Sequence, residues 1–371
     1  MSLVIDISRM RALAGGAVEL IARHQHPSGA YPACPTFPVY RYSWFRDGAF
    51  IAEGASRGGD ARGAGRFHDW CAGVLTARAG RIEELVARPR TAPVPRHDEF
   101  LPARYTLDGG EDHTDGWWNF QLDGYGTWLW ALSEHVRRQG ADPSRYAEAV
   151  RLTVRYLARF HDTPCYDWWE EHPEQVHVST LGAVFGGLGS ALDLGVLSPR
   201  DQETADAARR DIQALVARHG RLPGGGLAKW PGSDTVDAAL LACLVPFGLD
   251  DPDGAAGRAT LASVERALVR DHGVHRYRAD TFYGGGRWPV LAALLGWVYA
   301  RTGRPDEALA QLAWMASTAD GAGELPEQVG DPLLHPERRE EWVERWGEVA
   351  RPLLWSHGMF LILADELGVT R

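Results

Sequence analysis

The chain of 371 residues has the composition of a globular protein, with 45% hydrophobic and 24% charged residues. Its formal net charge of −10 argues against nucleic acid or an anionic membrane surface as a partner, and no apolar run is long enough to span a bilayer. The 4 cysteines form no CxxC pair, and the N-terminal residues lack the pattern of a signal peptide, so we expect reduced thiols in a cytoplasmic protein.

Helical periodicity dominates the chain, which predicts twelve helices and almost no strands. The predicted helices cover residues 7–24, 47 onward, 62–88, 122–139, 143–160, 177–195, 199–218, 234–247, 255–270, 288–302, 305–317 and 353–367. The irregular stretch over residues 89–120 ends in aromatic residues, so we interpret it as a functional loop rather than a linker. We therefore expect a single domain over residues 1–371.

Twelve helices in six pairs predict an all-α fold, an (α/α)6 barrel in which six helical hairpins form a toroid. Several connections within the pairs are short. The loops before every second helix are mostly long and rich in aromatic and charged residues. Because the inner helices of a toroid all begin at the same end, these loops should converge on one mouth, where we expect the functional site.

Two glutamates stand in loops of this kind. Glu170 follows Trp168 and Trp169, whereas Glu327 lies between Pro326 and a glutamine. An apolar wall of tryptophans would favour the protonated form of Glu170, as a general acid requires, and a more exposed Glu327 would stay ionised as a base. Each glutamate alone is more typical of an ordinary surface position, but together with the aromatic loops the pair points to hydrolysis of a glycosidic bond.

Further loop residues suit the binding of a sugar. Arg46 and Asp47 can make polar contacts to hydroxyl groups, and the face of Trp44 can pack against the C–H face of a ring. A buried pair of Arg46 and Asp47 that caps its helix is the alternative. Trp117 offers a second aromatic surface, with a place in the core as the alternative.

Other familiar signatures are missing from the sequence. The histidines at positions 97, 113 and 172 do not have the spacing of metal ligands. The glycine runs at 224–226 and 284–286 lack the strand–loop–helix setting of a phosphate loop. We therefore predict neither a metal site nor a cofactor.

Taken together, the motifs resemble the glucoamylase family, glycoside hydrolase family 15, in the same order along most of the chain. The matching segments are 40–47, which ends in Trp-Phe-Arg-Asp, 117–124, 167–171, which reads Asp-Trp-Trp-Glu-Glu, 276–288, 326–328 and 355–357, which reads Trp-Ser-His. The resemblance implies an (α/α)6 barrel and hydrolysis with inversion. It also implies that Glu170 is the general acid, that Glu327 is the general base, and that terminal glucose is bound by Arg46 and Asp47. The full set of implied substrate-binding residues is Trp44, Arg46, Asp47, Trp117, Trp169, Glu171, Arg276 and Trp355.

The sequence departs from the family in two respects. It contains neither the N-terminal β-sandwich of many bacterial members nor a starch-binding module, which favours small soluble substrates over insoluble starch. Phe282 also stands where members often have a tyrosine that lies near the aromatic residue matched by Tyr40. We hypothesise that Tyr40 here interacts directly with the attacking water and assists Glu327.

The sequence thus predicts an inverting, exo-acting hydrolase that releases β-glucose from short soluble α-glucosides, with a leaning toward α-1,6-linked, isomaltose-type substrates. A trehalase or an α-1,4-glucosidase of the same family is the nearest alternative. A glycoside phosphorylase on a similar toroid and a non-catalytic sugar-binding protein are more distant ones. A small oligosaccharide is the only partner we expect.

Overall fold

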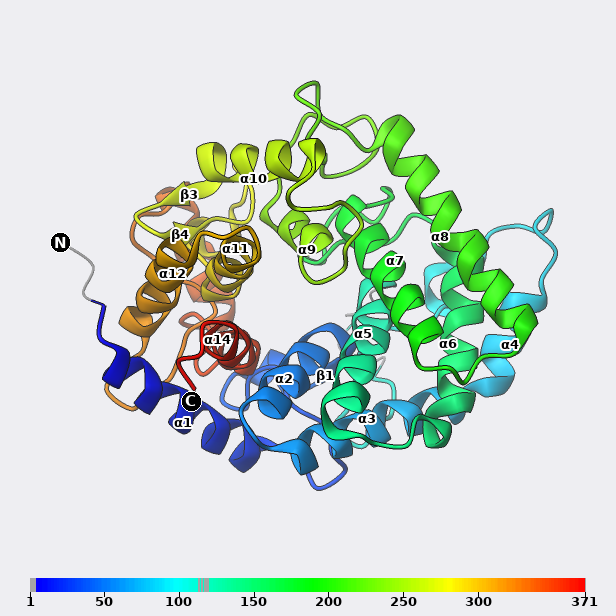
Figure 1. Ribbon diagram of the computed structural model, residues 1–371. Helices are drawn as coiled ribbons and strands as arrows, with labels where there is room; N and C mark the ends of the chain where they lie inside the picture. Colours follow the sequence, from blue (N-terminus) through cyan, green and yellow to red (C-terminus); the bar gives the residue numbers. More distant parts are fainter. Residues whose placement is uncertain (1–4, 113, 115, 117–119, 371) are drawn as a thin grey trace.

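The computed structural model describes residues 5–112, 114, 116 and 120–370, and its helices form a ring around a central axis (Figure 1). The inner wall consists of α2 (Phe45–Arg57), α5 (Asp123–Gln139), α7 (Val178–Asp193), α9 (Leu241–Leu244), α11 (Pro289–Arg301) and α14 (Leu354–Glu366). Each of these helices packs against the next, and α14 returns to α2, which closes the ring. The predicted all-α (α/α)6 barrel is confirmed.

Outer helices cover this ring from outside, in alternation with the inner ones (Figure 1). They are α1 (Ile7–His24), α3 (Ala61–Thr76), α4 (Ala79–Ala87), α6 (Ala147–Phe160), α8 (Pro199–His219), α10 (Ala255–Leu268) and α12 (Pro305–Thr318). Two short antiparallel pairs, β1 (Ser43–Trp44) with β2 (Arg104–Tyr105) and β3 (Val269–Arg270) with β4 (Gly273–Val274), join loop segments. Inner helices such as α11 are buried nearly all round, whereas α8 is largely polar, as their positions require.

Glycines allow the inner helices to approach one another closely. A Cβ atom on Gly54 of α2 would lie 2.3 Å from the carbonyl oxygen of Gly358 in α14. A Cβ atom on Gly187 of α7 would lie equally close, at 2.3 Å, to the carbonyl oxygen of Gly126 in α5. Because no side chain fits in either gap, the backbones themselves form these two contacts of the barrel wall.

Three elements differ from the sequence-based expectation. The helix predicted over 62–88 is broken after residue 76, where the Arg78 side chain turns back to the carbonyl of Val74. The helix predicted over 234–247 is only a 3-10 turn followed by α9, because Asp237 is drawn into contacts outside the helix and Pro246 prevents continuation. An additional helix, α13 (Arg339–Trp346), forms in the acidic segment before α14.

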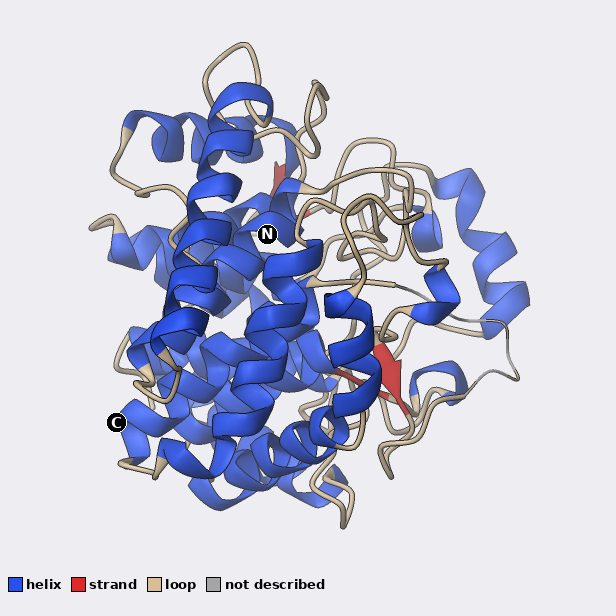
Figure 2. Cartoon of the chain, turned by 90° about the vertical axis from the view of Figure 1, so that its right-hand side faces the viewer, coloured by secondary structure: helices blue, strands red, loops and turns tan. Residues whose placement is uncertain are grey.

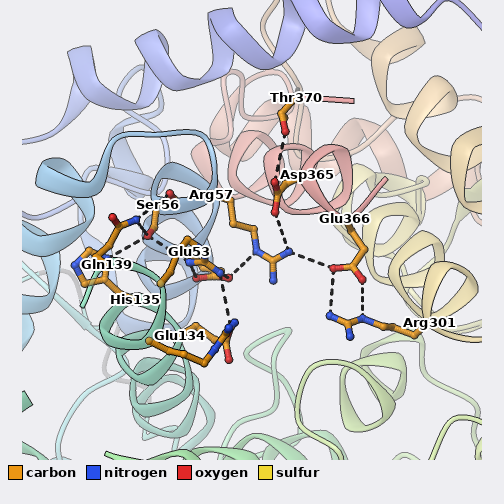
Figure 3. A network of polar contacts seen from close by, with 12 residues as sticks. Glu53, Ser56, Arg57, Glu134, His135, Gln139, Arg301, Asp365, Glu366 and Thr370 are labelled. Carbon is orange, nitrogen blue, oxygen red and sulfur yellow. Dashed lines mark hydrogen bonds and ion pairs between the residues drawn. The ribbon is translucent and has the colours of Figure 1, made fainter. Parts of the chain in front are cut away.

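A network of charged groups joins the inner helices at the end where they finish (Figure 3). Glu53 of α2 is fully buried, and its carboxylate accepts hydrogen bonds from Arg57, at 2.6 Å, and from Arg138 of α5, at 2.7 and 2.9 Å. Arg57 also pairs with Asp365 and Glu366 at the end of α14, at 3.4 and 3.3 Å. The network therefore ties α2, α5 and α14 together at this end of the barrel.

The long loops gather on the opposite side, where the inner helices begin (Figure 2). This is the arrangement that the alternation of short and long connections predicted. Among the described helices, none combines the length and the apolar character that crossing a membrane requires.

Candidate active site

A pocket of about 210 Å³ opens among these loops. Its walls come from β1 and the start of α2, from the loop before α7, from the loop before α11 and from the segment that leads into α14. The pocket brings together every predicted site residue that the structure describes, namely Tyr40, Trp44, Arg46, Asp47, Trp169, Glu170, Glu171, Arg276, Glu327 and Trp355. Trp117 lies outside the described residues.

Glu170 is presented by a tight turn. The carboxylate of Asp167 accepts hydrogen bonds from the backbone N–H groups of Trp169 and Glu171, both at 2.9 Å, so it wraps the turn around itself. Glu170 adopts a left-handed backbone conformation with φ 62°, which is costly for a non-glycine residue and is held by the surrounding contacts. Its carboxylate Oε1 accepts a hydrogen bond from Trp44 Nε1 at 2.6 Å.

Lys229 stabilises this turn through contacts with two buried carboxylates. Its ammonium group is buried, lies 3.1 Å from Asp167 Oδ2 and donates to Asp237 Oδ2 at 2.7 Å. Asp237 in turn accepts a hydrogen bond from Trp169 Nε1 at 2.9 Å. Burial would raise the pKa of Asp167, but Lys229, with His177 and backbone donors, outweighs burial and holds the pKa below its ordinary value. Asp167 therefore stays ionised beneath the turn that carries Glu170.

Glu327 lies deep in the pocket and is 4% exposed. Burial raises the pKa of its carboxyl from 4.5 to about 8, although a hydrogen bond from the Tyr40 hydroxyl and the charge of Arg276 act in the opposite direction. Its Oε2 atom has no hydrogen-bond partner in the described structure. This buried oxygen is therefore available to a hydroxyl group or a water in the pocket.

The start of α14 holds the Glu327 loop in place. Ser356 Oγ donates to the carbonyl oxygen of Pro326 at 2.8 Å, and the Leu325 N–H donates to His357 Nε2 at 2.9 Å. Burial lowers the pKa of His357 to about 3, so the ring stays neutral and its Nε2 atom can accept this bond. The Trp-Ser-His motif thus lines the pocket with its tryptophan and braces the loop with its other two residues.

The relative exposure of the two glutamates is the reverse of the sequence-based expectation. Glu327 was expected to be the more accessible carboxyl, yet it is buried, whereas Glu170 beside its tryptophans is only partly buried. The prediction was wrong because neighbours in the sequence do not determine burial at a loop. Glu327 is covered by Tyr40 and other residues from distant segments that line the same pocket.

Arg46 and Asp47 form the floor of the pocket and are 5% and 6% exposed. Arg46 donates to Gln121 Oε1 at 2.8 Å and to Asp123 Oδ2 at 3.1 Å, and its Nε atom lies 3.4 Å from Asp47 Oδ2. Burial raises the pKa of Asp47 to about 6, against the opposing charge of Arg46. The two residues are a buried ion pair and also line the pocket, and neither caps α2, whose N-cap is Trp44.

Arg276 lines the side of the pocket. Its Nε atom donates to Asp280 Oδ2 at 2.8 Å, and its guanidinium lies 3.5 Å from Glu171 Oε1. Glu171 also accepts a hydrogen bond from the Tyr277 hydroxyl. Both arginines that face the pocket are therefore already matched by carboxylates, and the remaining carboxyls make the site acidic.

Sequence reasoning did not identify Trp342 and Trp346, which also line the pocket. Their spacing of four residues places them on one face of α13, and this pattern was the signal available in the sequence. No group of three or more His, Cys, Asp or Glu side chains in residues 5–112, 114, 116 and 120–370 could hold a metal ion.

The pocket combines two carboxyls, a buried Arg–Asp pair and aromatic walls, a set that suits the cleavage of a sugar. Residues 8–318 match the sequence profile of glycosyl hydrolases family 15. The chain belongs to this family. As a family 15 member, it is a glycoside hydrolase that acts on α-glucosides.

Individual relatives agree with this membership. An isomaltose glucohydrolase of Kribbella flavida is 52% identical over 367 residues, which are 98% of this chain and 94% of that protein. A solved wild-type glycosidase is similar with a TM-score of 0.94 and 51% identity over 98% of each chain. A bacterial glucoamylase complexed with acarbose, at 19% identity, matches 96% of this chain and 56% of its own with a TM-score of 0.75, which bears on the fold.

Proposed function

We propose that the protein is an inverting, exo-acting hydrolase that releases β-glucose from short soluble α-glucosides, with isomaltose-type α-1,6 linkages preferred. One observation carries the proposal: Glu170 and Glu327, from loops 157 positions apart in the sequence, line the same small pocket. A pocket of about 210 Å³ has room for the end of a sugar chain rather than its middle, which supports exo action. The α-1,6 preference is supported by the high similarity to an isomaltose glucohydrolase.

In this proposal Glu170 donates a proton to the glycosidic oxygen while Glu327 takes a proton from the water that attacks the anomeric carbon. The position of Glu170 suits the acid, because a partly buried carboxyl can reach a leaving group that projects toward the mouth. Burial raises the pKa of Glu327 to about 8, close to the pH at which an enzyme works, and a base whose pKa lies in this range combines proton affinity with access to the ionised form that it must adopt to take the proton. Arg46 and Asp47 hold the hydroxyl groups of the terminal glucose.

The solved relatives support this choice of residues. Variants of the 51% identical glycosidase exchange two glutamates, one tyrosine and one phenylalanine, and one glutamate variant was solved in complex with glucose. The exchanged positions are each numbered eight above a residue of the same type in this chain, namely Tyr40, Glu170, Phe282 and Glu327. These residues therefore include both proposed catalytic carboxyls, the proposed assisting residue Tyr40, and Phe282, which departs from the family pattern.

A phosphorylase reaction is less well supported by the pocket. Phosphate would need unmatched positive charge, but Arg46 is paired with Asp123, and Arg276 is paired with Asp280. The four carboxyls that face the pocket, Asp47, Glu170, Glu171 and Glu327, outnumber the two arginines, so the lining offers an anion no surplus of positive charge. A neutral sugar with water as the acceptor fits this charge balance better.

The test is a panel of glucose disaccharides with the anomer of the released glucose followed by NMR. We expect the fastest hydrolysis with isomaltose, slower or no hydrolysis of maltose and trehalose, initial release of β-glucose and no dependence on phosphate. Glu170→Ala and Glu327→Ala should each lose nearly all activity. Glu324→Ala, three residues before the proposed base and outside the pocket, is the matched control and should remain active. Initial release of α-glucose would contradict inversion.

The same proposal predicts the distance between the two catalytic carboxyl groups. The carboxyl groups of an inverting pair lie about 6.5–9.5 Å apart, which leaves room for the water between them. We therefore expect this separation between Glu170 and Glu327 in a complex with a substrate analogue.

We also propose a cytoplasmic location, supported by four cysteines that lie buried as free thiols.

A further inference from the structure

The short helix α13 brings two aromatic residues to the pocket from a part of the chain beyond the family match, which ends at residue 318. Trp342 and Trp346 both line the pocket, and they lie one helical turn apart with their ring centroids 5.1 Å from each other. No residue of α13 is fully buried, and Trp346 packs against the edge of the hydrophobic core while part of its surface stays accessible. Both tryptophans therefore keep part of their surface available to a ligand in the pocket.

α13 is attached to the loop before α11 rather than to the barrel wall. Trp342 Nε1 donates to the carbonyl oxygen of Thr281 at 2.9 Å, and the Tyr283 hydroxyl donates to the carbonyl oxygen of Gly347 at 3.0 Å. The ring of Phe282 lies edge-on to Trp342, with 4.9 Å between ring centroids, and 6.2 Å from Trp346. These contacts fix the two indole rings as one aromatic wall of the pocket.

This aromatic wall, Trp342 and Trp346, differs in exposure from the charged floor. Arg46 and Asp47 are almost completely buried, whereas both tryptophans are only partly buried, so the tryptophans belong to the more solvent-accessible part of the lining. Glu170 is partly buried as well. If the terminal glucose of a disaccharide contacts the buried Arg46 and Asp47, its second ring must lie on the more accessible side of the pocket, where Glu170 and both tryptophans are found.

We propose that Trp342 and Trp346 form the binding site for the leaving sugar, the ring released when the glycosidic bond breaks. Indole faces pack against the C–H faces of a pyranose and carry no charge, so they select a neutral sugar of limited length. The inference rests on the proposed function, because it assumes that the terminal glucose occupies the floor. It adds that substrate choice depends on α13, which lies between two of the family motifs and was not identified from the sequence.

The experiment compares two substrates that differ only in the leaving group, isomaltose and α-glucosyl fluoride. Trp346→Ala should lower kcat/KM for isomaltose about tenfold, mostly through KM, because the second ring loses its stacking surface. Hydrolysis of α-glucosyl fluoride should stay within about twofold of the wild type, because fluoride does not reach the aromatic wall. Trp346→Phe, which keeps an aromatic face, should recover much of the isomaltose activity.

Glu344→Ala is the matched control, since this residue is exposed on the same helix and does not line the pocket. It should leave both substrates unaffected. An equal loss on both substrates in Trp346→Ala, or no loss on isomaltose, would overturn the leaving-sugar site. A wild-type enzyme that cleaves neither substrate would instead refute the proposed function, so the two failures are distinguishable.

Discussion

The indole nitrogen of Trp44 lies 2.6 Å from Oε1 of Glu170. Trp44 ends β1 immediately before α2, whereas Glu170 lies in the loop before α7, so this hydrogen bond joins two of the loops at the mouth. The turn around the Asp167 carboxylate fixes the backbone of Glu170, and the hydrogen bond from Trp44 fixes the direction of its carboxyl. The proposed acid is therefore oriented from two independent parts of the chain.

Trp44→Phe removes this hydrogen bond and keeps an aromatic ring. A side-chain hydrogen bond of this kind contributes about 1 kcal/mol, so we expect kcat on isomaltose to fall about fivefold. Trp70→Phe is the control, because Trp70 Nε1 donates to the carbonyl of Leu107, and Trp70 does not line the pocket. An unchanged kcat in Trp44→Phe would show that the bond does not orient the acid.

Lys229→Met should lower both the stability of the protein and its kcat. The substitution leaves Asp167 and Asp237 buried without their cation, which costs about 3–5 kcal/mol of unfolding free energy. Because Asp167 holds the turn of Glu170, kcat should also fall. Denaturant unfolding and steady-state kinetics measure the two effects. Adding Asp237→Asn to the variant should restore part of the stability, since one unpaired charge is removed.

The raised pKa of Glu327 gives stability a defined pH dependence. The folded state keeps the proton up to about pH 8, whereas the unfolded chain releases it near 4.5. Between these values the folded state binds the extra proton, so this contribution to stability is full below 4.5 and is lost as the pH rises toward 8.

The Glu327→Gln side chain cannot titrate. The melting temperature of the variant minus that of the wild type should therefore increase as the pH rises from 4.5 to 8. Thermal unfolding at a series of pH values measures the difference, and Asp47 titrates in both proteins. A difference that stays constant with pH would contradict the raised pKa.

Tyr40→Phe tests the hypothesis that Tyr40 assists Glu327. The hydroxyl of Tyr40 bonds Glu327, and the nearby position 282 is a phenylalanine that offers no second hydroxyl. We expect a large loss of kcat with little change in melting temperature. A Tyr40→Phe enzyme with near-normal turnover would refute the assistance.

Glu53→Gln should act on stability alone. Two arginines would remain at the far end of the barrel without their buried carboxylate, and we expect a loss of about 3–5 kcal/mol in unfolding free energy. At a permissive temperature kcat should be unchanged, because no residue of the network drawn in Figure 3 lines the pocket. Glu134→Gln, whose carboxylate is 25% exposed in the same network, should cost about 1 kcal/mol or less.

Local patterns predicted most of the helices, and the predicted site residues that the structure describes all line one pocket. Periodicity reflects which face of a helix is buried, and the alternation of short and long loops reflects which helix ends share a side, so both can be read without a structure. The prediction of one helix over 234–247 was wrong, because the Asp237 side chain accepts hydrogen bonds from Lys229 and Trp169 and the chain there forms only a short turn. α13 was missed because it is short and acidic, and its only apolar face consists of Trp342 and Trp346 with a partly buried Val343 beside them, which is too few residues to give a clear helical period.

By itself, the sequence determined the all-α barrel, the acidic loops at its mouth and the residue types available for hydrolysis, because these depend on neighbours along the chain. Only the tertiary structure decided that Glu327 is more buried than Glu170, that Lys229 lies beneath the acid turn, and that α13 brings tryptophans to the pocket. Burial and the electrostatic environment of a carboxyl depend on segments that are distant in sequence, and these segments meet only when the ring of helices closes.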